Sequence, residues 1–283
     1  MNSRAIDVPG SRELARIAET AARATGDRLR GAFRSRPEVA LKRDFHDPVT
    51  EHDRAAEETI RAVLAEHTPG SVVVGEEGGT RGEAGGGDGD VRWYVDPIDG
   101  TANFAAGLPF FCTSIAAVAG GEVVAGVVYD PVRDDMFTAS LDGATCNGAP
   151  IRAAGATEDR TGVIVTGYPN ARELKRAGDA ALRNYARLVE SFATVRRPGS
   201  AALCLAHVAA GWSDAAYGTS VNAWDVAAGL LLVRQAGGTY LPLGGAPDGD
   251  DWDAPGYVAC VGEFDLARSV LSEIAGLAPA AGR

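Results

Sequence analysis

The chain has 283 residues and a formal net charge of −11, and 46% of its residues are hydrophobic and 23% charged. This length is enough to bury a large core, and the composition is that of a globular protein rather than a disordered one. The acidic balance argues against nucleic acid as the main ligand and against an anionic membrane surface. If the ligand is an anion, some local feature has to reverse the sign of the charge.

The targeting and cysteine patterns point to the cytoplasm. Residues 1–16 contain no apolar segment of the kind a signal peptide needs, and the apolar run Val226–Val233 is far too short to cross a membrane. The chain has four cysteines, none close enough to another for a CxxC pair: Cys112, Cys146, Cys204 and Cys260. We therefore expect no zinc site and no disulfide framework, and we predict a cytoplasmic protein without a membrane anchor.

The first half of the chain, about residues 1–150, is predicted to form two helices and then an antiparallel meander. Ser11 can cap a helix that runs to about Phe33, and a second helix runs from Thr50 to about His67. The strands are expected at Val72–Gly75, Trp93–Val95, Phe111–Ala119, Glu122–Tyr129 and Asp135–Ala139. The Gly-rich segment 78–92 lacks the GK[ST] ending of a nucleotide-binding loop, so it is predicted to be a surface loop.

The second half, about residues 151–283, alternates between strands and helices. The strands are expected at Gly162–Gly167, Ala193–Arg197, Ser213–Tyr217, Thr239–Leu243 and Tyr257–Val261. The helices are expected at Arg172–Phe192, Gly199–Ala210, Trp224–Ala236 and Glu263–Ala275. Long helices mixed with largely antiparallel strands predict an α+β fold built of layered sheets and helices.

Acidic residues stand at the ends of predicted strands and at the starts of predicted helices. They are Asp53, Glu76, Glu77, Asp96, Asp99 and Asp225. Taken singly, each has a plain structural explanation as a capping box, a turn residue or a helix-start carboxylate. Together, carboxylates that converge on one crevice would repel one another unless cations lay between them. Oxygen ligands suit Mg²⁺, with Ca²⁺ or Mn²⁺ as substitutes, and two such ions can clamp a phosphoryl group for in-line displacement.

These motifs, in this order, resemble the inositol monophosphatase family of Mg²⁺-dependent, often lithium-sensitive phosphomonoesterases. The resemblance is carried by Asp53, Gly75–Glu77, Asp96–Thr101 (DPIDGT) and Trp224–Gly229 (WDVAAG), with weaker echoes at Cys146–Gly148 and Arg197–Ala202. It covers nearly the whole chain. It implies a single domain, residues 1–283, with a layered α-β-α-β-α sandwich of the sugar-phosphatase type whose two halves meet at the active site. It also implies a homodimer.

The resemblance further implies a role for each site residue. Two Mg²⁺ ions, with a third and weaker one beside Asp53, would be held by Glu76, Asp96, the carbonyl of Ile98, Thr101, Asp99 and Asp225. Glu77 would act behind these ligands or through a water. The catalytic residues would be Thr101, Asp53 and Glu76, which would orient and activate a water for direct attack on phosphorus. The substrate would be contacted by Gly100, Thr101, Gly199, Ser200, Ala201 and Asp225.

The choice of substrate is where this chain departs from the family pattern. Inositol phosphatases usually carry a sugar-contacting glutamate six residues before the Trp of the WD motif, and here that position is Gly218. Tyr217, Ser220 and Asn222 are polar neighbours that could contact a substrate instead. We expect a small phosphate monoester, inositol 1-phosphate or a related cyclitol or sugar phosphate, with histidinol phosphate as the alternative. No basic patch for a second phosphate is evident, which disfavours bisphosphates.

Two more distant readings remain. Haloacid-dehalogenase-type phosphatases carry D-x-D-G-T at a strand end, with the first Asp as nucleophile, but two residues rather than one separate Asp96 from Asp99. A mainly protein-binding role is the other, because some bacterial relatives of the family act in RNA-polymerase or ribosome-biogenesis complexes. The complete set of metal-site residues favours catalysis.

Overall fold

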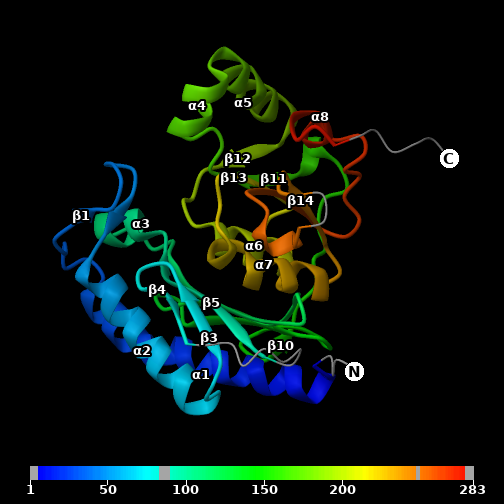
Figure 1. The fold of residues 1–283 in the computed structure, drawn as a ribbon. Coiled ribbons are helices and arrows are strands. Elements are labelled where there is room, and N and C mark those ends of the chain that lie inside the picture. Colours follow the sequence, from blue (N-terminus) through cyan, green and yellow to red (C-terminus); the bar gives the residue numbers. More distant parts are fainter. Residues whose placement is uncertain (1–5, 83–89, 247–248, 278–283) are drawn as a thin grey trace.

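The fold consists of five alternating layers of helices and strands (Figure 1). The computed structural model describes residues 6–82, 90–246 and 249–277. Helices α1 and α2 cover one face of an eight-stranded sheet, and α6 and α7 lie between this sheet and a five-stranded one. Helices α4, α5 and α8 form the outermost layer. The predicted α-β-α-β-α sandwich is therefore confirmed.

The first two helices follow the predicted pattern, except at one end. Helix α1 (Val8–Ala32) begins at Asp7, whose Oδ1 accepts a hydrogen bond from the backbone N of Gly10 at 2.9 Å. The prediction of Ser11 as the cap was wrong, because Ser11 is buried and its hydroxyl donates to the carbonyl of Val124 in the sheet at 2.6 Å. Helix α2 (Glu51–His67) starts as predicted, with Thr50 at the cap of a capping box.

The eight-stranded sheet has the order β10-β9-β8-β7-β6-β5-β3-β4, and every pair is antiparallel except β3 with β5. Its strands are β3 (Val72–Gly75), β4 (Gly79–Arg81), β5 (Arg92–Asp99), β6 (Cys112–Ala119), β7 (Glu122–Asp130), β8 (Asp135–Ser140), β9 (Gly143–Cys146) and β10 (Ala149–Pro150). Strand β6 is buried along its whole length because helices cover both faces, and its sequence is mostly apolar. Part of the predicted loop 78–92 is strand β4, and residues 83–89 lie outside the described residues.

The five-stranded sheet has the order β12-β11-β13-β15-β14, with β11 parallel to both of its neighbours. Its strands are β11 (Val163–Thr166), β12 (Thr194–Arg196), β13 (Ala215–Thr219), β14 (Thr239–Leu243) and β15 (Gly256–Cys260). The helices of this half are α4 (Ala171–Ala177), α5 (Asp179–Ser191), α6 (Ala201–Ala209), α7 (Ala223–Gln235) and α8 (Val270–Ile274).

Two predicted helices of this half are wrong in extent. The helix predicted over 172–192 is broken at Gly178, whose φ of 50° and ψ of −127° end α4 before α5 begins. The helix predicted over 263–275 is reduced to α8, which starts only after Ser269 caps it through a hydrogen bond from Leu271 N at 3.1 Å.

Short elements complete the fold. Strands β1 (Ala40–Leu41) and β2 (Pro48–Val49) form a hairpin, and α3 (Thr101–Ala106) follows β5 directly. Single turns of 3₁₀ helix cover Asp159–Thr161 and Asp251–Asp253. No helix among the described residues combines the length and the apolar character that crossing a membrane requires.

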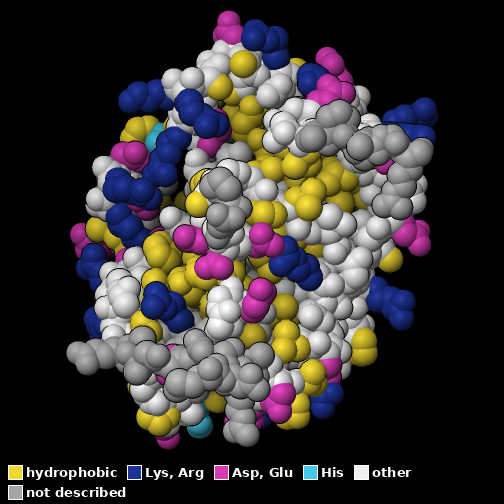
Figure 2. All heavy atoms as spheres, turned by 45° about the vertical axis from the view of Figure 1, so that its right-hand side comes forward, with side chains coloured by type: hydrophobic (Ala, Val, Ile, Leu, Met, Phe, Trp, Pro, Cys, Tyr) yellow, Lys and Arg dark blue, Asp and Glu magenta, His cyan; other side chains and the backbone are white. Residues whose placement is uncertain are grey.

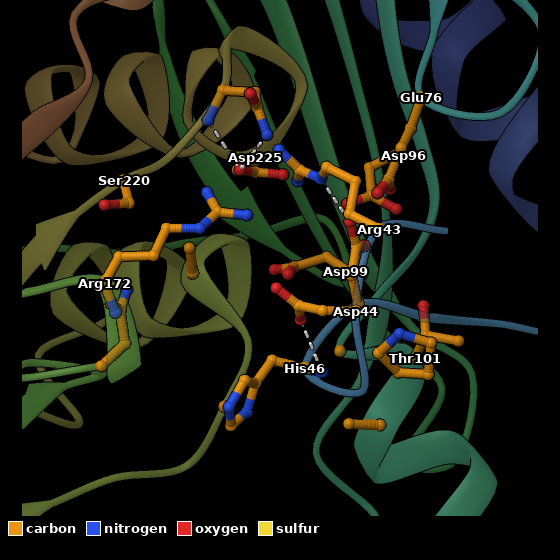
Figure 3. A pocket seen from close by; sticks show the side chains of 18 of the residues that line it. Arg43, Asp44, His46, Glu76, Asp96, Asp99, Thr101, Arg172, Ser220 and Asp225 are labelled. Atoms are coloured by element: carbon orange, nitrogen blue, oxygen red, sulfur yellow. Dashed lines mark hydrogen bonds and ion pairs between the residues drawn. The ribbon is translucent and has the colours of Figure 1, made fainter. Parts of the chain in front are cut away.

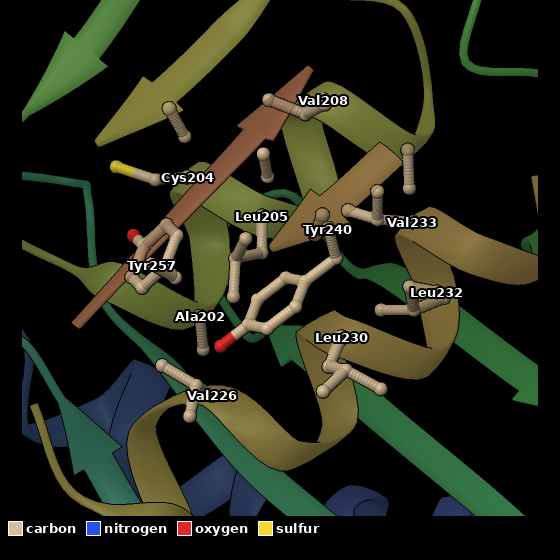
Figure 4. Packing of buried hydrophobic residues seen from close by; sticks show 14 of the residues in the cluster. Ala202, Cys204, Leu205, Val208, Val226, Leu230, Leu232, Val233, Tyr240 and Tyr257 are labelled. Carbon is tan, nitrogen blue, oxygen red and sulfur yellow. The ribbon is translucent and has the colours of Figure 1, made fainter. Parts of the chain in front are cut away.

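The core between the two sheets fixes the starts of α6 and α7. Leu205 of α6 and Leu230 of α7 pack with the tyrosines of β14 and β15 (Figure 4). The rings of Tyr240 and Tyr257 lie nearly parallel, with centroids 5.6 Å apart and planes at 15°. Close packing of this kind resists displacement, so the first residues of both helices have fixed positions relative to the end of β5.

Candidate functional site

A cavity of about 600 Å³ opens where the two halves of the chain meet. Its wall is formed by the ends of β3 and β5, the starts of α3, α4, α6 and α7, and the turn of the β1–β2 hairpin. Figure 3 shows its acidic side chains together with several basic ones. A volume of this size suits a small organic ligand.

Three aspartates from two elements converge in this cavity. One carboxylate oxygen from each of Asp96, Asp99 and Asp225 lies within 4.8 Å of the others. Residues three apart on a regular strand point to opposite faces. The pairing of β5 with β6 shifts register between Asp96 and Asp99, so this irregularity lets both side chains face the cavity.

Asp99 and Asp225 are each held by hydrogen bonds to one carboxylate oxygen, Oδ2. Ser200 Oγ and the backbone N of Ala202 each donate to Asp99 Oδ2 at 2.6 Å. The backbone N of Asn222 donates to Asp225 Oδ2 at 2.7 Å.

Burial makes this cluster unfavourable without a cation. Burial and the neighbouring charges raise the pKa of Asp96, and burial with the charge of Asp99 raises the pKa of Asp225 to about 8. Burial also raises the pKa of Asp99 to about 6, although its hydrogen bonds oppose the shift. An all-oxygen set of crowded carboxylates fits a hard divalent cation such as Mg²⁺.

Glu76 and Glu77 lie beside the aspartates on a turn that α2 holds in place. Glu57 of α2 is buried, and its carboxylate accepts hydrogen bonds from the backbone N of Glu77 and of Gly78, both at 2.8 Å. Lys42 from the hairpin lies 2.8 Å from Glu76 and also pairs with Glu77. Glu76 lines the cavity. Besides burial, its charge raises the pKa of Asp96, although its carboxylate is not one of the three that lie within 4.8 Å of one another.

The hydroxyl of Thr101, which lines the cavity, donates a hydrogen bond to the carboxylate of Asp53. Asp53 is only 1% exposed, and its Oδ2 accepts from the N and the Oγ1 of Thr50 at 2.8 and 2.6 Å. Its Oδ1 lies 2.9 Å from Thr101 Oγ1, which is also 3.0 Å from the carbonyl O of Ile98. The hydroxyl of Thr101 has one proton to donate, so its oxygen keeps an acceptor position free.

Glycines allow the backbones of the two halves of the chain to approach closely beside the cavity. Gly100 has a φ of 97°, and a Cβ there would lie 3.0 Å from the carbonyl O of Phe110, so both conformation and space require glycine. Asn103 Nδ2 donates to that carbonyl and to the carbonyl of Pro198, both at 2.7 Å. Gly199 and Ala201 line the cavity.

Comparison with known proteins identifies the chain. The profile of the inositol monophosphatase family matches residues 11–275. The chain belongs to this family. "Nus factor SuhB" of Pseudomonas aeruginosa is 41% identical over 224 residues, which are 78% of this chain and 82% of that protein. "Inositol-1-monophosphatase" of Mesorhizobium japonicum is 42% identical over 204 residues, 71% of this chain and 74% of that protein.

Solved structures agree with this assignment. The extragenic suppressor protein suhB from Bartonella henselae has a TM-score of 0.80 and 33% identity, covering 88% of this chain and 94% of that one. An inositol monophosphatase from Anabaena has a TM-score of 0.74 and 32% identity, covering 89% and 92%. This member of the inositol monophosphatase family is a phosphomonoesterase.

The position that distinguishes this chain from the family pattern does not face the cavity. Gly218 lies in β13 opposite Tyr257 of β15, and a Cβ at Gly218 would come within 2.3 Å of the Tyr257 ring. Tyr217 is buried and packs against Tyr168, with ring centroids 5.1 Å apart. Of the polar neighbours named from the sequence, Ser220 and Asn222 line the cavity.

Several residues of the cavity were not expected from the sequence. They are Arg43, Asp44, His46 and Asp47 of the hairpin turn, and Arg172 and Lys175 of α4. Lys42, which pairs with the cavity residue Glu76, was not expected either. In the sequence, the charged run between the first two helices indicated that the hairpin contributes polar groups to a site. The three-residue spacing of Arg172 and Lys175 indicated a basic face on the helix that carries them. Figure 2 shows acidic and basic side chains interspersed on one face of the molecule, so this face is not uniformly negative despite the negative net charge of the chain.

Proposed function

We propose that the protein hydrolyses a small phosphate monoester with the help of Mg²⁺. The observation that carries this proposal is the cluster of three aspartates, Asp96 and Asp99 buried and Asp225 half-buried, in a cavity that Gly100 and Thr101 also line. Glu76, Asp96, the carbonyl of Ile98, Asp99 and Asp225 would hold the ions. When bound, Mg²⁺ would neutralise phosphate charge and make a coordinated water more acidic.

The chain's own residues would position the reacting groups. Asp53 orients the hydroxyl of Thr101, whose free acceptor position would receive a hydrogen bond from the attacking water. The amides of Gly100 and Thr101 would donate to the phosphate oxygens. Ser200 is buried and donates to Asp99, so its proposed role is to position this carboxylate from behind the cavity wall.

The proposed substrate is inositol 1-phosphate or a related cyclitol or sugar phosphate, with histidinol phosphate as the alternative. A panel of phosphate monoesters tests this, with phosphate release measured in Mg²⁺, in Mn²⁺ and in chelator. We expect activity with Mg²⁺, loss of activity in chelator, and inhibition by lithium. Phosphate release that persists in chelator would contradict the proposed role of the metal.

The stereochemistry at phosphorus separates this mechanism from one with an aspartyl nucleophile. Direct attack by water on a chirally labelled phosphate in oxygen-18 water should invert the configuration at phosphorus. Retention would indicate a phosphoenzyme and would revive the haloacid-dehalogenase reading of Asp96.

A second candidate role comes from the relatives named "Nus factor SuhB", one of them 41% identical to this chain. This name supports a protein-binding role in transcription alongside catalysis. Co-purification with RNA polymerase would test it, and Asp99→Asn should abolish phosphate release without changing the co-purification. The expected homodimer can be checked by sedimentation at the same time.

A further inference from the structure

The wall that α4 contributes to the cavity carries two positive side chains, Arg172 and Lys175. They lie three residues apart on one helix, so they share a face. Figure 3 shows the Arg172 side chain pointing from α4 into the cavity. Glu173, between them in sequence, is buried instead, at 3% exposure. Helix α4 thus presents two cations to the space that the aspartates also line.

Buried contacts hold α4 in this position. The carboxylate of Glu173 accepts hydrogen bonds from Ser220 Oγ at 2.7 Å and from the backbone N of Asn170 at 2.8 Å. Arg197 donates to the carbonyls of residues 167–169, at 2.8 to 3.1 Å, and so fixes the chain that leads into the helix. The two cations are therefore carried by an anchored element.

Neither Arg172 nor Lys175 forms an ion pair within the part of the chain that the structure describes. The basic side chains of the hairpin already have acidic partners. Arg43 donates to Asp47 at 2.6 Å, and Lys42 pairs with Glu76. Two divalent ions at the proposed metal site would balance the negative charge of its carboxylates. The positive charges of Arg172 and Lys175 would then have no counter-charge. Like charges at this spacing on a helix repel each other, so an anion between them would be favoured.

The phosphate that is hydrolysed does not account for this pair. In the proposed function it lies against the amides of Gly100 and Thr101. Figure 3 draws Thr101 and Arg172 on opposite sides of the cavity, with Asp99 between them in this view. A group that reaches α4 therefore belongs to the alcohol part of the substrate.

We propose that Arg172 and Lys175 form a subsite for a second anionic group, a phosphate or a carboxylate, on the alcohol part of the substrate. This inference rests on the proposed function, which supplies the position of the first phosphate. A guanidinium can bind either group through two parallel N–H donors, and an ammonium adds a compact charge. The substrate class is then a phosphate monoester with a second acid group, which the absence of a basic patch in the sequence had disfavoured.

Paired substrates that differ only in the second acid group test this subsite. Fructose 1-phosphate is compared with fructose 1,6-bisphosphate for the phosphate arm, and glycerol 2-phosphate with 2-phosphoglycerate for the carboxylate arm. In Mg²⁺ the wild-type protein should prefer the doubly anionic member of at least one pair by about 10- to 100-fold in kcat/KM, as expected for charge-assisted hydrogen bonds. The arm that shows the preference identifies the group. In the variant with Arg172→Gln and Lys175→Gln this ratio should fall close to one.

Arg176→Gln is the matched control, because Arg176 is exposed on the same helix and does not line the cavity. It should keep the wild-type ratio. A wild-type ratio near one in both pairs, or a preference that survives in the double variant, would overturn the subsite. If no ester releases phosphate, the proposed function fails, and calorimetry with the phosphonate analogues of the same pairs decides the subsite alone. Equal affinities within each pair would then overturn it, and tighter binding that the double variant loses would support it.

Discussion

The Nζ atom of Lys42 lies 2.8 Å from Oε1 of Glu76, across the gap between the β1–β2 hairpin and the end of β3. The same ammonium pairs with Glu77. Burial alone would lower the pKa of Lys42, but the charges and hydrogen bonds of the two glutamates raise it. Lys42 therefore stays charged, and it competes with any metal ion for Glu76.

Replacing Lys42 with Met should destabilise the metal-free protein and strengthen its binding of Mg²⁺. Glu76 and Glu77 would lose their partner, which should lower the free energy of unfolding in chelator by about 1–3 kcal/mol. Thermal melts in chelator and a calorimetric Mg²⁺ titration measure both effects. Lys175→Met is the control, since it removes a lysine that lines the same cavity but has no ion pair among the described residues. A Lys42→Met protein that melts like wild type in chelator would contradict this account.

Replacing Gly218 with Ala should reduce stability rather than change specificity. The added Cβ would overlap the ring of Tyr257, which is fully packed between the sheet and α6, and overpacking of this kind costs about 1–3 kcal/mol. Gly167→Ala is the control, because a Cβ at Gly167 meets nothing within 4 Å. Denaturant unfolding gives the stabilities. Glutamate at this position would meet the same ring, so it is not expected to restore a sugar contact.

Local motifs made much of this site predictable. The capping box of Thr50 and Asp53, the turn after Asp99 and the helix start at Asp225 are all encoded within a few residues, and the structure has them as expected. Their convergence was inferred from family resemblance, and the structure shows it for Asp96, Asp99 and Asp225.

Contacts between distant segments were the part that the sequence could not reveal. The pairing of Lys42 with Glu76 spans 34 residues, and the hydrogen bond from Ser220 to Glu173 spans 47. Neither has a local signature, because each depends on how two layers pack. For the same reason the sequence could not show that Tyr257 of the neighbouring strand fills the space beside Gly218.

Removing the hydroxyl of Thr101 should slow the reaction much more than it weakens substrate binding. Thr101→Val keeps the shape of the side chain but cannot accept a hydrogen bond from water, so kcat should fall by about 10²- to 10⁴-fold with a smaller change in KM. Thr101→Ser should keep most of the activity, because its hydroxyl can still donate to Asp53. Steady-state kinetics on the best ester of the panel separate kcat from KM. Equal activity of the Val and Ser variants would show that this hydroxyl does not act in catalysis.

The loss of stability with rising pH should become smaller when Mg²⁺ is added. Asp99 and Asp225 have pKa values of about 6 and about 8 in the folded protein, raised mainly by burial, against 3.8 for an ordinary aspartate. At a pH between 3.8 and these raised pKa values, each of the two groups binds more protons in the folded state than in the unfolded chain. In chelator, the contribution of these groups to the free energy of unfolding should therefore be highest at about pH 4 and below. It should fall as the pH rises from about 4, up to about 6 for Asp99 and up to about 8 for Asp225.

Mg²⁺ binds the ionised carboxylates, so its stabilising effect should grow over the same range of pH. At free metal about 100 times the dissociation constant the gain is about 2.7 kcal/mol per site. Asp99→Asn removes one raised carboxyl group and one proposed ligand, while its side-chain oxygen can still accept from Ser200 and Ala202. The variant should therefore lose less stability with rising pH in chelator and gain less from Mg²⁺ than wild type. Thermal melts of both proteins from pH 5 to pH 8, with chelator and with Mg²⁺, measure all four curves. An undiminished Mg²⁺ shift in Asp99→Asn would show that Asp99 is not a ligand and would leave the DPIDGT segment as an ordinary turn at the end of β5.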